Sequence, residues 1–145
     1  MLFVLFKSLD SIFSIEANHT LEISRMVNIT SLPSESGKIN ALVNYRGRTI
    51  PVLDVCKYLE NGQAQYNNES VIIIIEYKNQ AVGLLAHDVI DMITVEATKV
   101  QEYKVLNSDY FNSAIQIGST IVPILNPKKI LLDVVDSMEL MKAST

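Results

Sequence analysis

The chain has 145 residues, of which 48% are hydrophobic and 19% are charged, so it is neither a mostly disordered chain nor too short to bury a core. Its length suits one domain or two small, closely packed ones. The net charge of -4 and the scattering of the twelve lysines and arginines argue against a nucleic-acid-binding protein, because contacts with phosphates need clustered basic side chains.

Short strands rich in β-branched and aromatic residues, separated by turn-forming residues, are predicted throughout the first half of the chain. They span residues 2–6, 12–15, 21–23, 27–32, 39–45 and 49–52. A surface loop is expected at 34–38, and residues 46–48 are expected to turn a hairpin. Asp54 then suits the N-cap of a short helix over 55–60.

A polar segment at 63–70 marks the seam between two halves, and the second half repeats the scheme. Its strands are predicted at 71–77, 81–85, 92–95, 114–117 and 120–124. The apolar run at 71–75 is far shorter than the roughly 20 residues needed to cross a bilayer. It therefore predicts a buried strand, and no insertion into a membrane is expected.

The end of the chain is predicted to form a helix, because Asn126 can cap it and Pro127 suits its first position. Apolar residues at helical spacing follow on one face: Ile130, Leu131, Val134, Val135 and Met138. This face either packs on the strands or binds a partner. Packing is the simpler hypothesis, because it accounts for every residue on the face.

The hairpin sequence at 41–54 returns in a plainer form at 114–126. In both copies an alternating apolar strand is followed by a Gly turn, a second strand with a Pro, and an Asp or Asn that can cap a helix. If the glycines of the two turns are aligned, Arg46 stands where the second copy has Ile117. A hairpin of this kind therefore does not require the arginine in order to fold, and Arg46 becomes a candidate functional residue.

The prolines of the two copies, Pro51 and Pro123, are 72 residues apart, and each half contains about five strands. Five short, twisted strands commonly close into a small barrel, which removes exposed sheet edges. We therefore expect an all-β fold with minor helices, in which two five-stranded barrels pack together beside a C-terminal helix. Residues 1–145 are expected to form one domain, whose halves span approximately 1–68 and 69–145 and can exchange strands.

Residues that could catalyse a reaction or bind a metal are sparse. Cys56 is the single cysteine, so no intrachain disulfide is possible, and with no signal peptide visible a reducing, cytoplasmic location is expected. His19 and His87 lie in separate predicted elements without metal-ligand spacing. The pair His87-Asp88 is compatible with an oriented general base, but it is more typical of a solvated surface pair. We expect no enzyme activity, no metal and no cofactor.

The first hairpin also carries a motif that resembles a known family. Residues 41–55 match the pattern G-V-I-N-L-R-G-x-V-x-P-V-x-D-L of the CheW-like family. Supporting matches are Phe13-Ser14-Ile15 and Glu22-Ile23 for Y-A-L and E-I, Ile29-Thr30-Ser31-Leu32-Pro33 for I-T-x-L-P, and Val82-Gly83-Leu84-Leu85 for V-G-L-L. The resemblance covers nearly the whole chain.

The resemblance implies a non-enzymatic adaptor, or scaffold, of two SH3-like five-stranded barrels that couples chemoreceptors to a CheA-like histidine kinase in a chemotaxis two-component system. The implied partners are the regulatory domain of the kinase and the cytoplasmic tip of a receptor, whose helical hairpin enters the groove between the barrels. No nucleic acid is implied. By motif, the partner-binding candidates in this sequence are Thr20, Glu22, Ile23, Ala41, Arg46, Val82 and Gly83.

Three of the positions in the hairpin leave alternatives open. Arg46 has five donors in a rigid fork, which suits either carboxylates of a partner or an internal salt bridge with Glu22 or Asp54. Tyr45 replaces the family's usual aliphatic residue, and it either contacts a partner or packs on the barrel; it is kept among the candidates. Ala41 replaces the usual Gly, and its methyl is expected to affect the receptor contact more than the fold.

Two other functions stay open on the sequence alone. The chain could be an adaptor of another chemosensory pathway, such as pilus motility. It could also be a small β-barrel enzyme or ligand-binding protein that uses the cleft between the barrels, and a deep polar pocket around His87 would favour that hypothesis.

Overall fold

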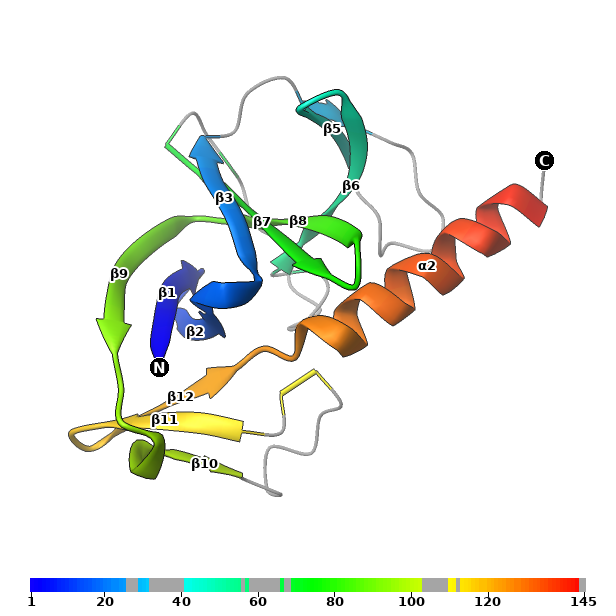
Figure 1. The fold of residues 1–145 in the computed structure, drawn as a ribbon. Coiled ribbons are helices and arrows are strands. Elements are labelled where there is room, and N and C mark those ends of the chain that lie inside the picture. Colours follow the sequence, from blue (N-terminus) through cyan, green and yellow to red (C-terminus); the bar gives the residue numbers. More distant parts are fainter. Residues whose placement is uncertain are drawn as a thin grey trace.

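In the computed structural model, the described residues form twelve strands in two sheets of six strands each, mostly antiparallel, and a long helix follows them (Figure 1). The structure describes residues 1–25, 29–31, 41–55, 57, 66, 69–102, 110–111 and 113–143. The loop expected at 34–38 and most of the helix expected at 55–60 and of the seam at 63–70 lie outside these residues.

Sheet A has the strand order β10-β11-β12-β2-β1-β9. Its strands are β1 (Leu2–Ser8), β2 (Ser11–Glu16), β9 (Asp88–Thr94), β10 (Val100–Glu102), β11 (Ser113–Ile117) and β12 (Thr120–Ile124). Two single turns of 3-10 helix, η1 (Ala17–His19) and η2 (Ala97–Lys99), follow β2 and β9.

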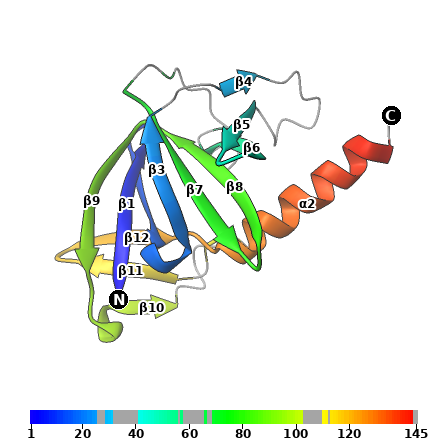
Figure 2. The ribbon, with the colours of Figure 1, turned by 45° about the horizontal axis from the view of Figure 1, so that its top comes forward.

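Sheet B has the order β3-β7-β8-β6-β5-β4. Its strands are β3 (Thr20–Arg25), β4 (Ile29–Ser31), β5 (Ala41–Tyr45), β6 (Arg48–Asp54), β7 (Val71–Tyr77) and β8 (Gln80–Ala86). The helix α2 (Pro127–Ala143) contacts β7 and β8 and then projects beyond both sheets (Figure 2).

Each duplicated hairpin pairs in parallel with a strand from the other half of the sequence. Strand β6 lies beside β8, with Val52 opposite Gly83, and β12 lies beside β2, with Ile124 opposite Ser14. The second of these pairings is extended by the backbone hydrogen bond from Leu125 N–H to the carbonyl of Ser14 (2.8 Å). Both sheets therefore contain strands from both halves of the chain.

The apolar strands are buried on both faces, and successive side chains enter different cores. In β7, Ile73 and Ile75 belong to a central cluster that also receives residues of β1, β2, β8 and α2, whereas Ile72 and Ile74 belong to a second cluster within sheet B. In β1, Val4 lies in the central cluster and Phe3 lies in a third cluster, within sheet A. The unbroken apolar runs of the sequence thus supply a core on each side of the strand.

The helix α2 begins where the sequence predicts. The Lys128 N–H donates to the side-chain oxygen of Asn126 (3.1 Å), which confirms the N-cap. Ile130, Leu131 and Val134 are buried in the central cluster. The predicted apolar face therefore packs on the sheets over these turns.

The expected class, all-β with a C-terminal helix, is confirmed, and the structure adds one strand, β10, to those predicted. Strand β10 was missed because it has only three residues, of which Gln101 and Glu102 are polar and exposed. It follows η2 as β3 follows η1, and both 3-10 turns begin after a Glu and open with Ala. This repeated Glu-Ala pair was a signal of the duplication that the hairpin comparison overlooked.

Candidate functional site

The turn between β5 and β6 contains two residues, Arg46 and Gly47, because Tyr45 pairs with Arg48 across the hairpin. Both turn residues have positive φ, 49° for Arg46 and 81° for Gly47, as in the type I′ turns that connect two strands tightly. The side-chain oxygen of Asn44 accepts a hydrogen bond from Gly47 N–H (3.1 Å) and holds the turn.

The corresponding turn of the second copy corrects the sequence alignment. Ile117 pairs with Thr120, so the turn is Gly118-Ser119, and Gly118 has a φ of 59°. Arg46 therefore corresponds to Gly118 and not to Ile117, with the same spacing of 72 residues that separates the two prolines. Aligning the glycines was wrong by one residue, because the first turn carries its glycine in the second position.

This correspondence places Arg46 at a position where the fold favours glycine. An L-residue in the left-handed region costs roughly 1–2 kcal/mol, because its Cβ approaches the following carbonyl oxygen. The Arg46 side chain is exposed, and its guanidinium carbon lies 5.4 Å from the centre of the Tyr45 ring. Backbone strain of this kind is often kept at functional sites.

The internal salt bridge considered for Arg46 does not form. Across the described ranges, Arg46 makes no ion pair with Glu22 or Asp54. The Asp54 carboxylate instead accepts hydrogen bonds from the Tyr66 hydroxyl and from Lys57 N–H, the second at 3.3 Å. Asp54 thus caps the following turn as the sequence predicts, and the Arg46 charge remains available to a partner.

Arg48 has a structural contact that sequence reasoning missed. Its guanidinium lies 3.5 Å from the Glu76 carboxylate and donates to the carbonyl of Asn79 at 3.2 Å. It thereby links the β5–β6 hairpin to the β7–β8 hairpin. The sequence offers only the opposite charges of Arg48 and Glu76 as a sign of this contact, because the fold brings their strands together.

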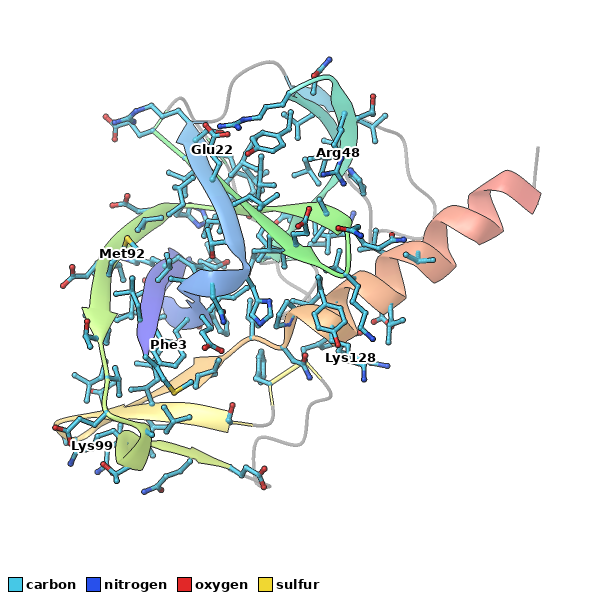
Figure 3. All side chains as sticks on the ribbon, in the orientation of Figure 1. Phe3, Glu22, Arg48, Met92, Lys99 and Lys128 are labelled. Atoms are coloured by element: carbon cyan, nitrogen blue, oxygen red, sulfur yellow. The ribbon has the colours of Figure 1, made fainter. Side chains whose placement is uncertain are left out.

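Three candidate residues lie on β3, which forms an edge of sheet B. Glu22 is exposed (Figure 3). Ile23 is half-buried against the central cluster, and Thr20 carries a buried hydroxyl with no hydrogen-bond partner in the described structure. The register shifts between Thr20 and Glu22, so Leu21 forms a bulge and is 42% exposed. A bulged edge strand is protected from pairing with further strands, but its side chains remain available.

Three other candidates are buried inside sheet B. Ala41 is 4% exposed and Val82 is 0% exposed. A Cβ on Gly83 would lie 2.9 Å from Cγ2 of Ile72, closer than real Cβ atoms approach, and 3.3 Å from Cγ2 of Val52, which is a tight contact. Gly83 thus permits close packing in the core, and these three residues shape the sheet rather than its surface.

Tyr45 combines the two roles that the sequence left open. It packs, half-buried, against the apolar cluster of sheet B, and it lies beneath the Arg46 guanidinium. The ring therefore limits the directions that Arg46 can take.

His87 joins the two sheets. Its backbone N–H donates to the carbonyl of Lys7 (2.9 Å), its Nδ1 accepts from Leu9 N–H (3.0 Å), and its ring stacks on Tyr66. Because Nδ1 is already used by a backbone donor, Asp88 does not orient this ring as in a general base. Within the described ranges, no three His, Cys, Asp or Glu side chains gather as metal ligands would, and no helix is long and apolar enough to span a bilayer.

Comparisons with known proteins agree on one family. The family model described as the CheW-like domain matches residues 2–135. The chain is 27% identical over 110 residues to the chemotaxis protein CheW of Rhizobium meliloti, which covers 76% of this chain and 71% of that protein. It is 28% identical over 89 residues to the chemotaxis protein CheW of Bacillus subtilis, covering 61% and 57% of the two chains.

The fold is similar to a solved structure as well. The crystal structure of the scaffolding protein TtCheW from Thermoanaerobacter tengcongensis superposes with a TM-score of 0.78, at 22% sequence identity. The match covers 86% of this chain and 88% of that one. At this identity the likeness concerns the fold.

Proposed function

Since the chain belongs to the CheW-like domain family, we propose that it is a non-enzymatic scaffold that couples chemoreceptors to a CheA-like histidine kinase. The observation that carries this proposal is the family match, which extends over both sheets and the start of α2. The names of the relatives point the same way, because they are chemotaxis proteins and one solved relative is a scaffolding protein. A cytoplasmic location beside the receptor tips is part of the proposal.

In this proposal the partners contact Thr20, Glu22 and Ile23 on β3, and Tyr45 and Arg46 at the β5–β6 turn. Ala41, Val82 and Gly83 act indirectly, by keeping sheet B closely packed beneath that surface. The support for Arg46 is physical: it is exposed, unpaired in the described structure, stacked on Tyr45 and strained where the second copy has glycine. Arginine is also enriched among the residues that dominate binding energies.

Titration calorimetry tests the proposal, with the full chain and either the regulatory domain of a CheA-like kinase from the same organism or a receptor-tip fragment. We expect saturable binding to at least one of them. Arg46→Ala should weaken it about 30-fold, the factor that corresponds to about 2 kcal/mol. Arg48→Ala is the matched control, since it removes the same charge two residues away and should leave the affinity unchanged.

The absence of binding to both fragments would contradict the scaffold function. Equal affinities of the wild type and Arg46→Ala would instead contradict only the role of Arg46. An adaptor of another chemosensory pathway, such as pilus motility, uses the same kind of contacts, and it is distinguished by which of the organism's kinases binds.

A further inference from the structure

A second surface, formed by the start of α2 and the β7–β8 hairpin, is hollowed between apolar and basic side chains. It is a pocket of about 300 Å³ between the start of α2 and the β7–β8 hairpin, called the α2 pocket below. Its lining residues are Tyr77, Lys78, Gln80, Lys128, Leu131, Leu132 and Val135. A neighbouring pocket of about 380 Å³ shares Lys128 and Leu132 with it, so the hollow extends along the first turns of the helix.

The apolar part of the α2 pocket is unusually open to solvent. Leu132 is 52% exposed, more than any other large apolar side chain in the described part of the chain. Leu131, one residue earlier, is 3% exposed and belongs to the central cluster. The pocket thus reaches from an exposed leucine down to the core.

The charges at the α2 pocket are positive, although the chain as a whole is negative. Lys78 and Lys128 are exposed, and neither forms an ion pair with a described residue. Among the side chains that the structure describes, none of those lining the pocket is acidic. Two carboxylates that neighbour lining residues in the sequence form ion pairs elsewhere, Glu76 with Arg48 (3.5 Å) and Asp133 with Lys129 (3.7 Å).

The helix that forms one wall of the pocket is firmly anchored. The Tyr110 hydroxyl donates to Asp133 (2.6 Å), and the Tyr110 carbonyl accepts from Asn126 N–H (2.6 Å). On the other wall, Lys78 follows Tyr77 in a tight turn, with its amine 5.5 Å from the centre of the Tyr77 ring. Preformed walls reduce the entropy lost on binding.

We propose that the α2 pocket binds an acidic amphipathic segment of a partner protein, with an apolar side chain against Leu132 and carboxylates beside Lys78 and Lys128. The charge complementarity selects this occupant: the lysines favour carboxylates, and the apolar wall favours an aliphatic or aromatic side chain. Two unpaired lysines are too few for tight binding to a nucleic-acid backbone. Neither Tyr45 nor Arg46 lines the α2 pocket, so it is a binding site in addition to the one proposed at the β5–β6 turn.

The probe for this site is a synthetic 15-residue helical peptide with Leu at i, i+3 and i+7 and Glu at the flanking positions. Titrated into the ¹⁵N-labelled full chain, it should shift amide signals of residues 77–80 and 128–135 in a saturable manner. The double variant Lys78→Glu/Lys128→Glu should weaken its binding roughly 10-fold, because two attractive charge pairs become repulsive. A second peptide, in which Lys replaces every Glu, reverses the charges. The double variant should bind this basic peptide more tightly than the wild-type protein does.

The matched control is Lys7→Glu/Lys99→Glu, which changes the net charge equally at exposed positions outside the pocket; Figure 3 shows Lys99 well away from Lys128. It should bind the acidic peptide almost as the wild type does. Leu132→Ser, a change at an exposed position that should not unfold the chain, should weaken binding about 5-fold. Shifts centred elsewhere, no saturation at millimolar peptide, or equal weakening by both double variants would each overturn the proposal.

Discussion

Arg48 on β6 and Glu76 on β7, which are 28 positions apart in the sequence, form an ion pair at 3.5 Å that joins two hairpins. Arg46, two residues before Arg48, forms no such contact among the described residues. The two arginines that flank Gly47 therefore have different roles: Arg48 stabilises the arrangement of sheet B, and Arg46 is available to a partner.

We expect Arg48→Ala to lower the free energy of unfolding by about 1 kcal/mol, and Arg46→Ala to change it by less than about 0.5 kcal/mol. The first value is small because the side chains of Arg48 and Glu76 are 48% and 29% exposed, so solvent screens the pair. Urea denaturation of both variants measures the difference. Equal losses would show that Arg46 is structural.

Arg46→Gly should make the protein more stable, by about 0.5 to 1 kcal/mol, while it weakens partner binding. Glycine relieves the strain at a φ of 49°, and this gain exceeds the entropy that a glycine loses on folding. Thermal unfolding and calorimetry with the kinase or receptor fragment check the two effects separately. If the variant is less stable than Arg46→Ala, the left-handed conformation is not a source of strain.

Gly83→Ala should destabilise the chain by about 1–3 kcal/mol, because its methyl would overlap Cγ2 of Ile72. Ile72→Leu removes that atom, so the double variant should lose less than the sum of the two single losses. Additive losses in urea denaturation would mean that the clash is relieved elsewhere.

Ala41→Gly, which restores the family's usual residue, should lower stability by about 1–2 kcal/mol and leave partner affinity unchanged. The Ala41 methyl is buried in the apolar cluster of sheet B, so its loss removes packing and adds backbone entropy to the unfolded chain. Calorimetry with the kinase or receptor fragment measures the affinity. A tighter complex would show that the methyl does affect the partner surface.

Asn126→Ala should destabilise the chain by about 1 kcal/mol, since Lys128 N–H loses its side-chain acceptor. Asn126→Asp keeps the acceptor and adds a negative charge at the N-terminal end of α2, so it should be at least as stable as the wild type. Thermal unfolding of the pair checks both outcomes. If Asn126→Asp lost as much stability as Asn126→Ala, capping of α2 by this side chain would be contradicted.

Most strands could be predicted because local rules determine them. The unbroken apolar run of β7, the alternation in β5 and the residues that cap α2 act within a few positions of the chain. The missed strand, β10, has no apolar run of its own and exists because β11 pairs with it. The division of the chain near residue 68 remains a prediction, since most of the seam lies outside the described residues.

The candidate site was less predictable than the fold. The motif selected Ala41, Val82 and Gly83 together with Arg46, but a motif does not distinguish buried residues from exposed ones. The sequence comparison also misaligned the two hairpin turns by one residue. Matching glycine to glycine ignores which turn position has a positive φ.

By itself, the sequence determined the all-β class, the repeated hairpin and the helix start, because propensity, side-chain alternation and capping operate locally. Only the tertiary structure decided that each hairpin pairs with a strand of the other half, that Arg48 is tied to Glu76 while Arg46 is free, and that Leu132 is exposed beside two lysines. These features depend on which distant segments of the chain meet. Whether a side chain is buried, and which charge it pairs with, is decided only by those contacts.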